Sequence, residues 1–348
     1  MDSARPLVHD DTVLRLWAAA RAQRLPHGLL FEGRAGIGKF AAAKWFAAGC
    51  LCARGPGEPC GSCGPCRRVA SGGAEANHPD LFVIDPLAEE EEQIKIGRIA
   101  ARGSDEDAGG RPSLEAFLGL RAHEAGLRPV LVRECHRMNL AAQNALLKTL
   151  EEPRPGTVLV LETHKSAALL ATIRSRCIRI RFDAPTHAQC AEVLARAGLT
   201  GEAALALARL ADGAPGVALA LAQNGAREVV ACVARVARGE RPPQAAAQEL
   251  WELEGEFPGR TEAARDRARA RVALDLTQRL VREALHAAVG VAPSELALGD
   301  EAAALGARLG ERELAHRART LATIRADIDR NLGAASAVER ALLVLAAG

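Results

Sequence analysis

The stretch Gly33-Arg-Ala-Gly-Ile-Gly-Lys39-Phe40 decides the fold class of this chain. It matches the pattern Gly-x4-Gly-Lys, follows an apolar run at Gly28–Phe31 that predicts a strand, and opens a helix-like segment. In a phosphate-binding loop of this kind, glycines let backbone N–H groups cradle phosphates and the lysine reaches the β and γ oxygens. The stretch predicts an α/β domain whose candidate nucleotide-binding residues are Gly33, Gly36, Gly38 and Lys39.

Further short apolar runs follow, each bounded by Gly, Pro, Asp or His, and several are continuously apolar, as strands buried on both faces of a parallel sheet are. Helix-like segments separate them; that at Asn139–Glu151 starts at a capping residue and has Pro153 just beyond its end. The strands are expected at Leu81–Ile84, Val130–Arg133, Val158–Glu162 and Cys177–Phe182.

The β pattern ends near Pro185, and the remainder of the chain reads as helices. Short helices around Asp212-Gly213 come first, and longer amphipathic helices follow. We therefore predict three domains: a P-loop α/β domain over residues 1–184, a small helical domain over 185–222 and an all-α domain over 223–348.

Two positions argue against metal-dependent hydrolysis. A phosphate loop usually continues with Ser or Thr, whose hydroxyl ligates Mg²⁺, but Phe40 stands there. An acid at the end of a neighbouring strand usually holds the same ion, yet the strand at Val130–Arg133 ends in an arginine followed by Glu134. Glu134 could orient water, but the positive charge of Arg133 repels Mg²⁺, so we expect no bound Mg²⁺.

Five of the nine cysteines crowd into residues 50–66. Cys60-Gly-Ser-Cys63-Gly-Pro-Cys66 contains two overlapping Cys-x2-Cys steps, and Cys52 or Cys50 supplies a fourth thiolate. Four thiolates close a tetrahedral Zn²⁺ site with no open position, so the predicted role of zinc is structural. An iron–sulfur cluster and unmetallated thiols are the alternatives.

Composition sets limits on the class of protein. The 45 Lys and Arg residues nearly balance the 43 Asp and Glu residues, which disfavours a chain that grips nucleic acid unaided. No apolar run reaches the roughly 18 residues that a membrane helix needs. The N-terminus lacks the basic and apolar regions of a secretory signal, so we expect no membrane association and a reducing, cytoplasmic location.

The segment Thr172-Ile-Arg174-Ser-Arg176-Cys177 precedes the last predicted strand. An arginine at the edge of a sheet can stabilise charge on a nucleotide held by a neighbouring subunit. All but five of the 45 cationic residues are arginines, so composition alone singles out neither Arg174 nor Arg176.

Several long motifs in one order resemble the bacterial clamp-loader branch of the AAA+ ATPases. The resemblance covers residues 20–220 closely and the helical remainder loosely, and it implies a P-loop domain with a zinc knuckle, a helical lid and a helical collar that joins an oligomer. The motifs are Gly33–Lys39, the cysteine insert, His78-Pro79-Asp80, Asn144–Pro153 and Ser175-Arg176-Cys177.

Motor subunits of that family carry Gly-Lys-Thr or Gly-Lys-Ser, an Asp-Glu-x-His after the third strand and a sensor arginine after the Asp-Gly of the second domain. This chain has Phe40, Arg133 and Gly216 at those positions but keeps Ser175-Arg176-Cys177. The resemblance implies a stator that does not hydrolyse ATP and offers Arg176 to the ATP site of an adjacent motor subunit. Because Lys39 and the glycines remain, silent ATP binding stays open.

The resemblance also implies partners: γ/τ motor subunits and δ in a hetero-oligomeric ring, with the sliding clamp and primed DNA reached through the complex. The implied role is to help load the clamp onto primed DNA within the replicative polymerase holoenzyme. An ATP-hydrolysing motor subunit of the same loader is the first alternative. The second is a zinc-knuckle nucleic-acid-binding module, disfavoured by a net charge of +2 and by three Trp, seven Phe and no Tyr.

Overall fold

The structure is a computed structural model that describes residues 5–71, 78–100, 110–124, 126–253, 255, 257, 261–292, 296–328 and 333–346. The chain divides into two compact units, Met1–Gln189 and Cys190–Gly348. The first unit contains the α/β region, and every element of secondary structure described in the second unit is a helix.

The first unit is built on a five-stranded parallel sheet with the strand order β2-β3-β4-β1-β5. Leu29 of the fourth strand in that order lies opposite Val160 on one side and Ile178 on the other. Each strand begins and ends within two residues of its expected bounds, which confirms the α/β class. The strands are β1 (Gly28–Glu32), β2 (Phe82–Ile84), β3 (Arg128–Val132), β4 (Thr157–Thr163) and β5 (Ile178–Arg181).

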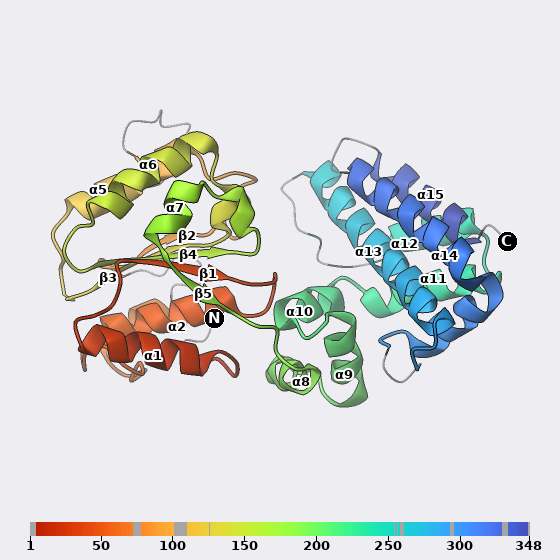
Figure 1. The fold of residues 1–348 in the computed structure, drawn as a ribbon, viewed down its shortest axis with the longest axis horizontal. Helices are drawn as coiled ribbons and strands as arrows, with labels where there is room; N and C mark the ends of the chain where they lie inside the picture. The colour runs from red at the N-terminus through yellow and green to blue at the C-terminus, as the bar shows by residue number, and fades with distance from the viewer. Residues whose placement is uncertain are drawn as a thin grey trace. The chain divides into compact units, whose positions relative to one another are not determined.

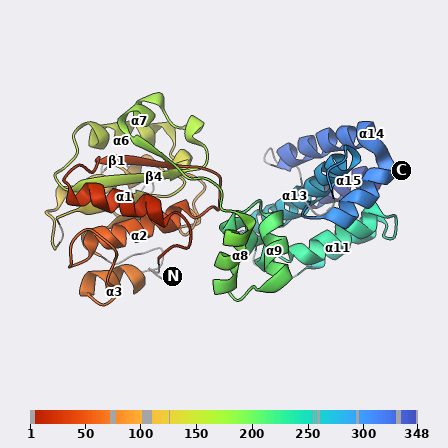
Figure 2. The ribbon, with the colours of Figure 1, turned by 60° about the horizontal axis from the view of Figure 1, so that its bottom comes forward.

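Helices cover both faces of this sheet (Figure 1). On one face lie α1 (Asp10–Arg21) and α2 (Lys39–Leu51), and on the other α5 (Leu114–Gly119), α6 (Leu140–Glu151) and α7 (Ala171–Arg176). Most of α2 is buried, and its Trp45 ring lies 4.5 Å from the ring of Trp17 in α1. Figure 2 shows α3 (Gly64–Ser71) on the outer side of α2, away from the sheet.

The ends of α6 show how local sequence sets the boundaries. The side chain of Asn139 caps the helix by accepting the N–H of Ala142 at 2.8 Å, and the helix ends two residues before Pro153. The helix expected at Asn139–Glu151 is thereby confirmed. One-turn 3-10 helices follow β3 at Cys135–Arg137 and β4 at Ser166–Ala168, and a third lies at Ile96–Arg98.

The order of the strands decides where functional side chains gather. All residues of β1, β3 and β4 are buried, so polar groups at their carboxyl ends meet in one place beside the loop between β1 and α2. The edge strand β5 is largely exposed, with Ile178 56 % exposed. A candidate site therefore lies where parallel sheets with such crossovers usually place one.

The second unit contains eight described helices. One hydrophobic cluster draws its buried residues from α8 to α10, and a larger one joins α11 to α15. The division of residues 185–222 from 223–348 stays a prediction. The helices are α8 (His187–Arg196, whose first turn belongs to the first unit), α9 (Gly201–Leu210), α10 (Pro215–Gln223), α11 (Ala226–Ala237), α12 (Pro243–Glu252), α13 (Glu262–Ala288), α14 (Gly299–Ile328) and α15 (Ala334–Ala346).

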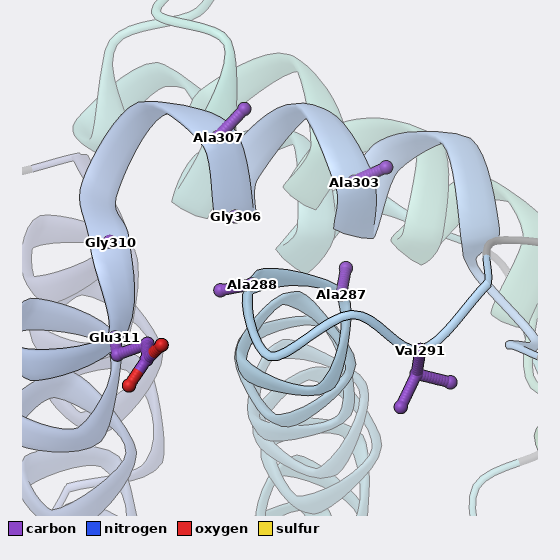
Figure 3. A pocket seen from close by; sticks show the side chains of 8 residues that line it. All are labelled: Ala287, Ala288, Val291, Ala303, Gly306, Ala307, Gly310 and Glu311. Atoms are coloured by element: carbon purple, nitrogen blue, oxygen red, sulfur yellow. The ribbon is translucent and has the colours of Figure 1, made fainter.

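The crossing of α13 and α14 depends on small residues. A Cβ on Gly306 would lie 2.7 Å from the carbonyl oxygen of Ala284, so glycine allows the two backbones to approach. Four residues later, α14 is kinked at Gly310, which has φ 71° and ψ 168°. A cavity of about 510 Å³ opens beside this crossing, lined mainly by alanine and glycine (Figure 3).

Within the described residues, no single helix has the length and apolar character needed to cross a membrane. Only α9 and α10 taken together meet both requirements, and a bend of 112° separates them.

Candidate phosphate loop, metal centre and exposed arginine

The loop between β1 and α2 has the backbone of a phosphate-binding loop. Gly33, Gly36 and Gly38 have φ of 154°, 73° and 99°, which are left-handed values that side chains with a Cβ rarely adopt. A Cβ on Gly33 would also lie 2.4 Å from the carbonyl oxygen of Phe182. The sequence-predicted glycines are therefore required by the shape of the loop itself.

Lys39 is turned toward the protein. Its ammonium donates to the carbonyl oxygen of Arg34 at 2.5 Å and lies 3.0 Å from Oε1 of Glu162, and the residue is 3 % exposed. Glu162, near the end of β4, also accepts the backbone N–H of Glu134 at 3.0 Å. To reach a phosphate, Lys39 must leave a buried carboxylate partner, which costs far more than leaving an exposed one.

Aromatic and cationic side chains occupy the region where Mg²⁺ ligands are expected. The guanidinium of Arg133 and the ammonium of Lys44 each lie 5.0 Å from the centre of the Phe40 ring. Arg133 also donates to both carboxylate oxygens of the buried Asp85, at 3.1 and 3.2 Å. Two cations around an apolar ring, with the nearby acid already paired, form an unfavourable environment for a divalent cation.

Burial lowers the pKa of Lys44, the charge of Asp85 raises it and that of Arg133 lowers it. In the second unit, Gly216, where the resemblance expects the sensor arginine of motor subunits, is exposed in the first turn of α10. Neither the Phe40 ring nor the Arg133 guanidinium offers an oxygen ligand to a nucleotide-bound metal.

The structure gathers four of the five clustered cysteines. The sulfur atoms of Cys52, Cys60, Cys63 and Cys66 all lie within 4.8 Å of one another, and Cys50 is not part of this group. Cys50 is instead buried within α2, and burial raises the pKa of its thiol. Of the two candidates for the fourth thiolate, only Cys52, at the C-cap of α2, joins the other three sulfurs.

Local hydrogen bonds favour thiolates in this cluster. Cys60 Sγ accepts from the Ser62 hydroxyl at 3.5 Å and from the Cys63 N–H at 3.4 Å, and these bonds lower its pKa to about 5. Cys63 Sγ accepts the N–H of Cys66 at 3.5 Å. Burial raises the pKa of the Cys66 thiol, so the donors favour the thiolate at Cys60 and Cys63. Four sulfurs gathered in this way fit a tetrahedral Zn²⁺ ion, and all four would hold it.

Arg176 lies at the last position of α7. Its side chain is 36 % exposed, and its guanidinium pairs with Oε1 of Glu151 at 2.6 Å and donates to the carbonyl oxygen of Thr172 at 3.1 Å. Glu151 is itself 49 % exposed, so this is a surface ion pair. Arg174 in the same helix is half-buried.

The carboxylates that pair with Lys39, Arg133 and Arg179 were not among the predicted site residues. Glu162, Asp85 and Glu32 stand at or just beyond the carboxyl ends of buried strands, which is the sequence signal that could have found them. Glu32 accepts from Arg179 at 2.8 Å; burial raises its pKa, but the hydrogen bond and charge of Arg179 outweigh burial and lower it.

Comparison with known proteins places this geometry in a family. A family model described as DNA polymerase III, delta subunit, matches residues 8–186. DNA polymerase III subunit delta' of Pseudomonas aeruginosa is 37 % identical over 249 residues, which cover 70 % of this chain and 70 % of that protein. The chain belongs to the delta' family of DNA polymerase III subunits.

Other relatives match parts of this delta' family member. DNA polymerase III subunit delta' of Escherichia coli is 35 % identical over 213 residues, covering 60 % of this chain and 58 % of that protein. DNA polymerase III subunit tau/gamma of Haemophilus influenzae is 33 % identical over 173 residues, 49 % of this chain but 22 % of that protein. The family model spans the loop, the cysteine cluster and Arg176.

Proposed function

We propose that this delta' family member is the stator of a clamp loader: it helps to load the sliding clamp onto primed DNA and supplies Arg176 in trans to ATP bound by a neighbouring motor subunit. One observation carries the proposal. Of the two cations that ATP chemistry would use, Lys39 is held in a buried ion pair, whereas Arg176 is exposed and held only by a surface pair.

The energetic difference between these two pairs supports the assignment. Exposed ion pairs contribute roughly 0 to 1 kcal/mol, so Arg176 can exchange Glu151 for a phosphate oxygen at small cost. A guanidinium also binds phosphate through two parallel N–H bonds, which an ammonium cannot do. Arg176 is thus suited to stabilise the charge that develops on a transferring phosphoryl group.

The chain's own loop is proposed to be catalytically silent. Phe40 removes the hydroxyl that ligates Mg²⁺, and Arg133 pairs with the nearby Asp85 while its charge repels a cation. The glycine backbone and Lys39 remain, so binding of ATP without hydrolysis is compatible with this role. ATP hydrolysis where this chain meets a motor subunit would then take place in the motor subunit's own site.

The partners follow from the same proposal. Residues 1–184 would form the AAA+ domain, 185–222 the lid and 223–348 a collar that joins motor subunits of the γ/τ type and δ in a ring in the cytoplasm. The hydrophobic cluster that joins α11 to α15 gives residues 223–348 a core of their own, as a separate collar domain would need. Contact with clamp and DNA would come through the assembled complex.

The cysteine cluster is proposed to hold one structural Zn²⁺ through Cys52, Cys60, Cys63 and Cys66. With four thiolates the ion has no open position and supplies no catalysis; it ties the end of α2 to the start of α3. Elemental analysis of the purified chain should find one zinc per molecule and no iron. Cys52→Ser should lose the zinc, and zinc retained by this variant but lost from Cys50→Ser would contradict the assignment.

The test of the stator role is Arg176→Ala in the assembled clamp loader. Assembly should remain near wild type, because a single surface pair is lost, while ATP turnover at the one interface that Arg176 completes should fall by about 10³ to 10⁵. DNA-stimulated ATPase and clamp loading measure this loss. Arg174→Ala is the matched control from the same helix and should retain both activities.

Three outcomes would overturn the proposal. Equal damage from Arg174→Ala, or normal clamp loading by the Arg176→Ala complex, would place the role on another residue. ATP turnover by the isolated chain that disappears in Lys39→Ala would favour a motor subunit, the reading that agrees with the partial match to a tau/gamma subunit.

A further inference from the structure

A second cluster of possible metal ligands lies at the carboxyl ends of β3 and β4. It consists of Glu134, directly before the 3-10 helix that follows β3, His136 within that helix and His164 directly after β4. One ligand atom from each residue lies within 4.8 Å of the others. The parallel pairing of β3 with β4 brings these residues together, although 28 residues separate His136 from His164.

The donor atoms of the cluster are already close to the spacing that an ion imposes. Nδ1 of His164 lies 3.1 Å from one oxygen of Glu134, and Nε2 of His136 lies 3.4 Å from the other. A tetrahedral ion with ligands at about 2.1 Å separates its donor atoms by roughly 3.4 Å. Small side-chain rotations would therefore suffice to direct all three donors at one point.

The backbone and a neighbouring hydroxyl hold the cluster in place. Nδ1 of His136 lies 3.0 Å from Oγ1 of Thr163, and the same oxygen accepts the backbone N–H of Lys165 at 2.9 Å. When Nδ1–H donates to Thr163, the lone pair of Nε2 faces the cluster; metal-binding histidines are commonly oriented by such a hydrogen bond from the other ring nitrogen. Glu134 itself has a left-handed backbone, with φ 50°.

Solvent reaches one side of the cluster. The side chains of His164, Glu134 and His136 are 23 %, 11 % and 10 % exposed, so an ion can enter and water can take a fourth position. Arg137 is the cation that competes for Glu134, at 3.8 Å and 32 % exposed. Arg137 can turn to solvent when an ion replaces it, because its pair with Glu134 is long and partly exposed.

We propose that Glu134, His136 and His164 form a binding site for a divalent transition-metal ion, of the Zn²⁺ or Co²⁺ kind, distinct from the cysteine cluster. Two imidazoles and one carboxylate suit such ions and are a poor set for Mg²⁺, which requires six oxygen ligands. The ion would join the carboxyl ends of β3 and β4 beside the loop. This site does not depend on the role proposed for Arg176.

Titration with Co²⁺ of the full-length chain that carries one zinc ion, held by the cysteine cluster, tests the site. We expect one Co²⁺ per chain, with visible absorption bands of a nitrogen and oxygen ligand set and without sulfur-to-cobalt charge-transfer bands. His164→Ala, which removes the more exposed histidine, should weaken Co²⁺ binding at least tenfold, and Thr163→Val should weaken it by about tenfold because His136 loses the hydroxyl that orients its ring.

Control variants separate this site from the rest of the chain. His187→Ala removes an exposed histidine outside the cluster and should bind Co²⁺ as the wild type does, as should Cys63→Ser. Circular dichroism and the melting temperature establish that each variant is folded. Absence of Co²⁺ binding, binding that His164→Ala leaves unchanged, or binding that Cys63→Ser abolishes would overturn the proposal.

Discussion

The phosphate loop and the end of α7 each hold a cation in an ion pair, but the pair in the loop is buried and the pair at α7 is exposed. Lys39 is 3 % exposed and lies 3.0 Å from a buried carboxylate, whereas Arg176 is 36 % exposed on its side chain and its partner Glu151 is half exposed. Both cations have an acidic partner within 3 Å, so a list of ion pairs does not distinguish them. Exposure to solvent distinguishes them. Water screens the pair between Arg176 and Glu151 and can take the place of either partner, but it does not reach the pair between Lys39 and Glu162.

This difference bears on what each region can do. Phosphate entering the loop would compete with a desolvated ion pair, while phosphate reaching Arg176 would compete only with a surface contact. The loop has the backbone of a phosphate-binding loop with Phe40 and Arg133 beside it, and α7 presents Arg176 at the surface. Breaking the buried pair should therefore cost much more stability than breaking the exposed one.

Glu162→Gln should have the largest effect on folding. The substitution leaves the buried ammonium of Lys39 without its carboxylate, and removing one partner of a buried pair costs about 3 to 5 kcal/mol. Urea denaturation of the full-length chain with Trp251→Phe, in which the fluorescence comes from Trp17 and Trp45, measures the loss. The matched variant Glu151→Gln breaks the surface pair with Arg176 and should cost less than about 1 kcal/mol.

The comparison fails if these two glutamate variants lose similar stability. Equal losses would mean that Lys39 finds another partner when Glu162 is neutralised, and that the loop lysine is as available for phosphate as Arg176 is.

Arg133→Gln should have an intermediate effect. It removes a partly exposed pair with Asp85 and a cation from the face of Phe40, and together these contacts contribute about 1 kcal/mol. Oδ1 of Asp85 keeps the backbone N–H groups of Leu87 and Ala88 as donors, and the charge of Lys44 remains near the carboxylate, so only Oδ2 loses its donor. The same denaturation experiment measures the change.

Arg181→Gln is the control for this position. Its side chain is 80 % exposed and lies 3.3 Å from Glu32, so its loss should leave stability nearly unchanged. A larger loss in Arg181→Gln than in Arg133→Gln would show that the contacts of Arg133 with Phe40 and Asp85 contribute nothing to stability.

The smallest expected effect is a pH dependence set by His9, whose ring lies 2.9 Å from the carbonyl oxygen of Ile37 in the loop. Burial lowers its pKa; the hydrogen bond to Ile37 and the charges of Asp183 and Asp10 raise it, and Lys39 lowers it. The unfolded imidazole takes up a proton near pH 6.5, earlier than the folded one. His9 therefore stabilises the fold fully above pH 6.5, and this stability is lost as the pH falls below that value.

Denaturation midpoints between pH 7.5 and 5.5 test this sign. His9→Gln should lose less stability over that range than the wild type, whereas His123→Gln, which changes an exposed imidazole, should follow the wild type. A steeper loss in His9→Gln would show that the protonated ring is the form favoured by folding.

Local patterns predicted much of the first unit. Apolar runs bounded by turn residues located the five strands within two residues, and the cap at Asn139 located the start of α6, because burial in a parallel sheet and helix capping depend on neighbouring residues. The glycines of the loop were predictable for the same reason, since left-handed backbone strongly favours glycine. The three cysteines of the two overlapping Cys-x2-Cys steps were likewise predictable from their spacing.

Contacts between distant segments were not predictable in this way. Spacing leaves both Cys50 and Cys52 open as the fourth ligand and the resemblance favours Cys52, but only the end of α2 places the sulfur of Cys52 with the other three. Glu162 lies in β4 and His164 directly follows it, and the continuously buried residues of that strand do not indicate which loop its carboxyl end meets.

The sequence by itself determined the α/β class, the loop backbone, the clustered cysteines and the loss of two Mg²⁺ ligands, because each follows from residue type and short spacing. Only the tertiary structure decided that Lys39 is paired with Glu162, that Arg133 pairs with Asp85 and that Arg176 stays at the surface. The physical reason is that the strength and availability of a charge depend on the solvent around it and on partners that the order of strands brings together.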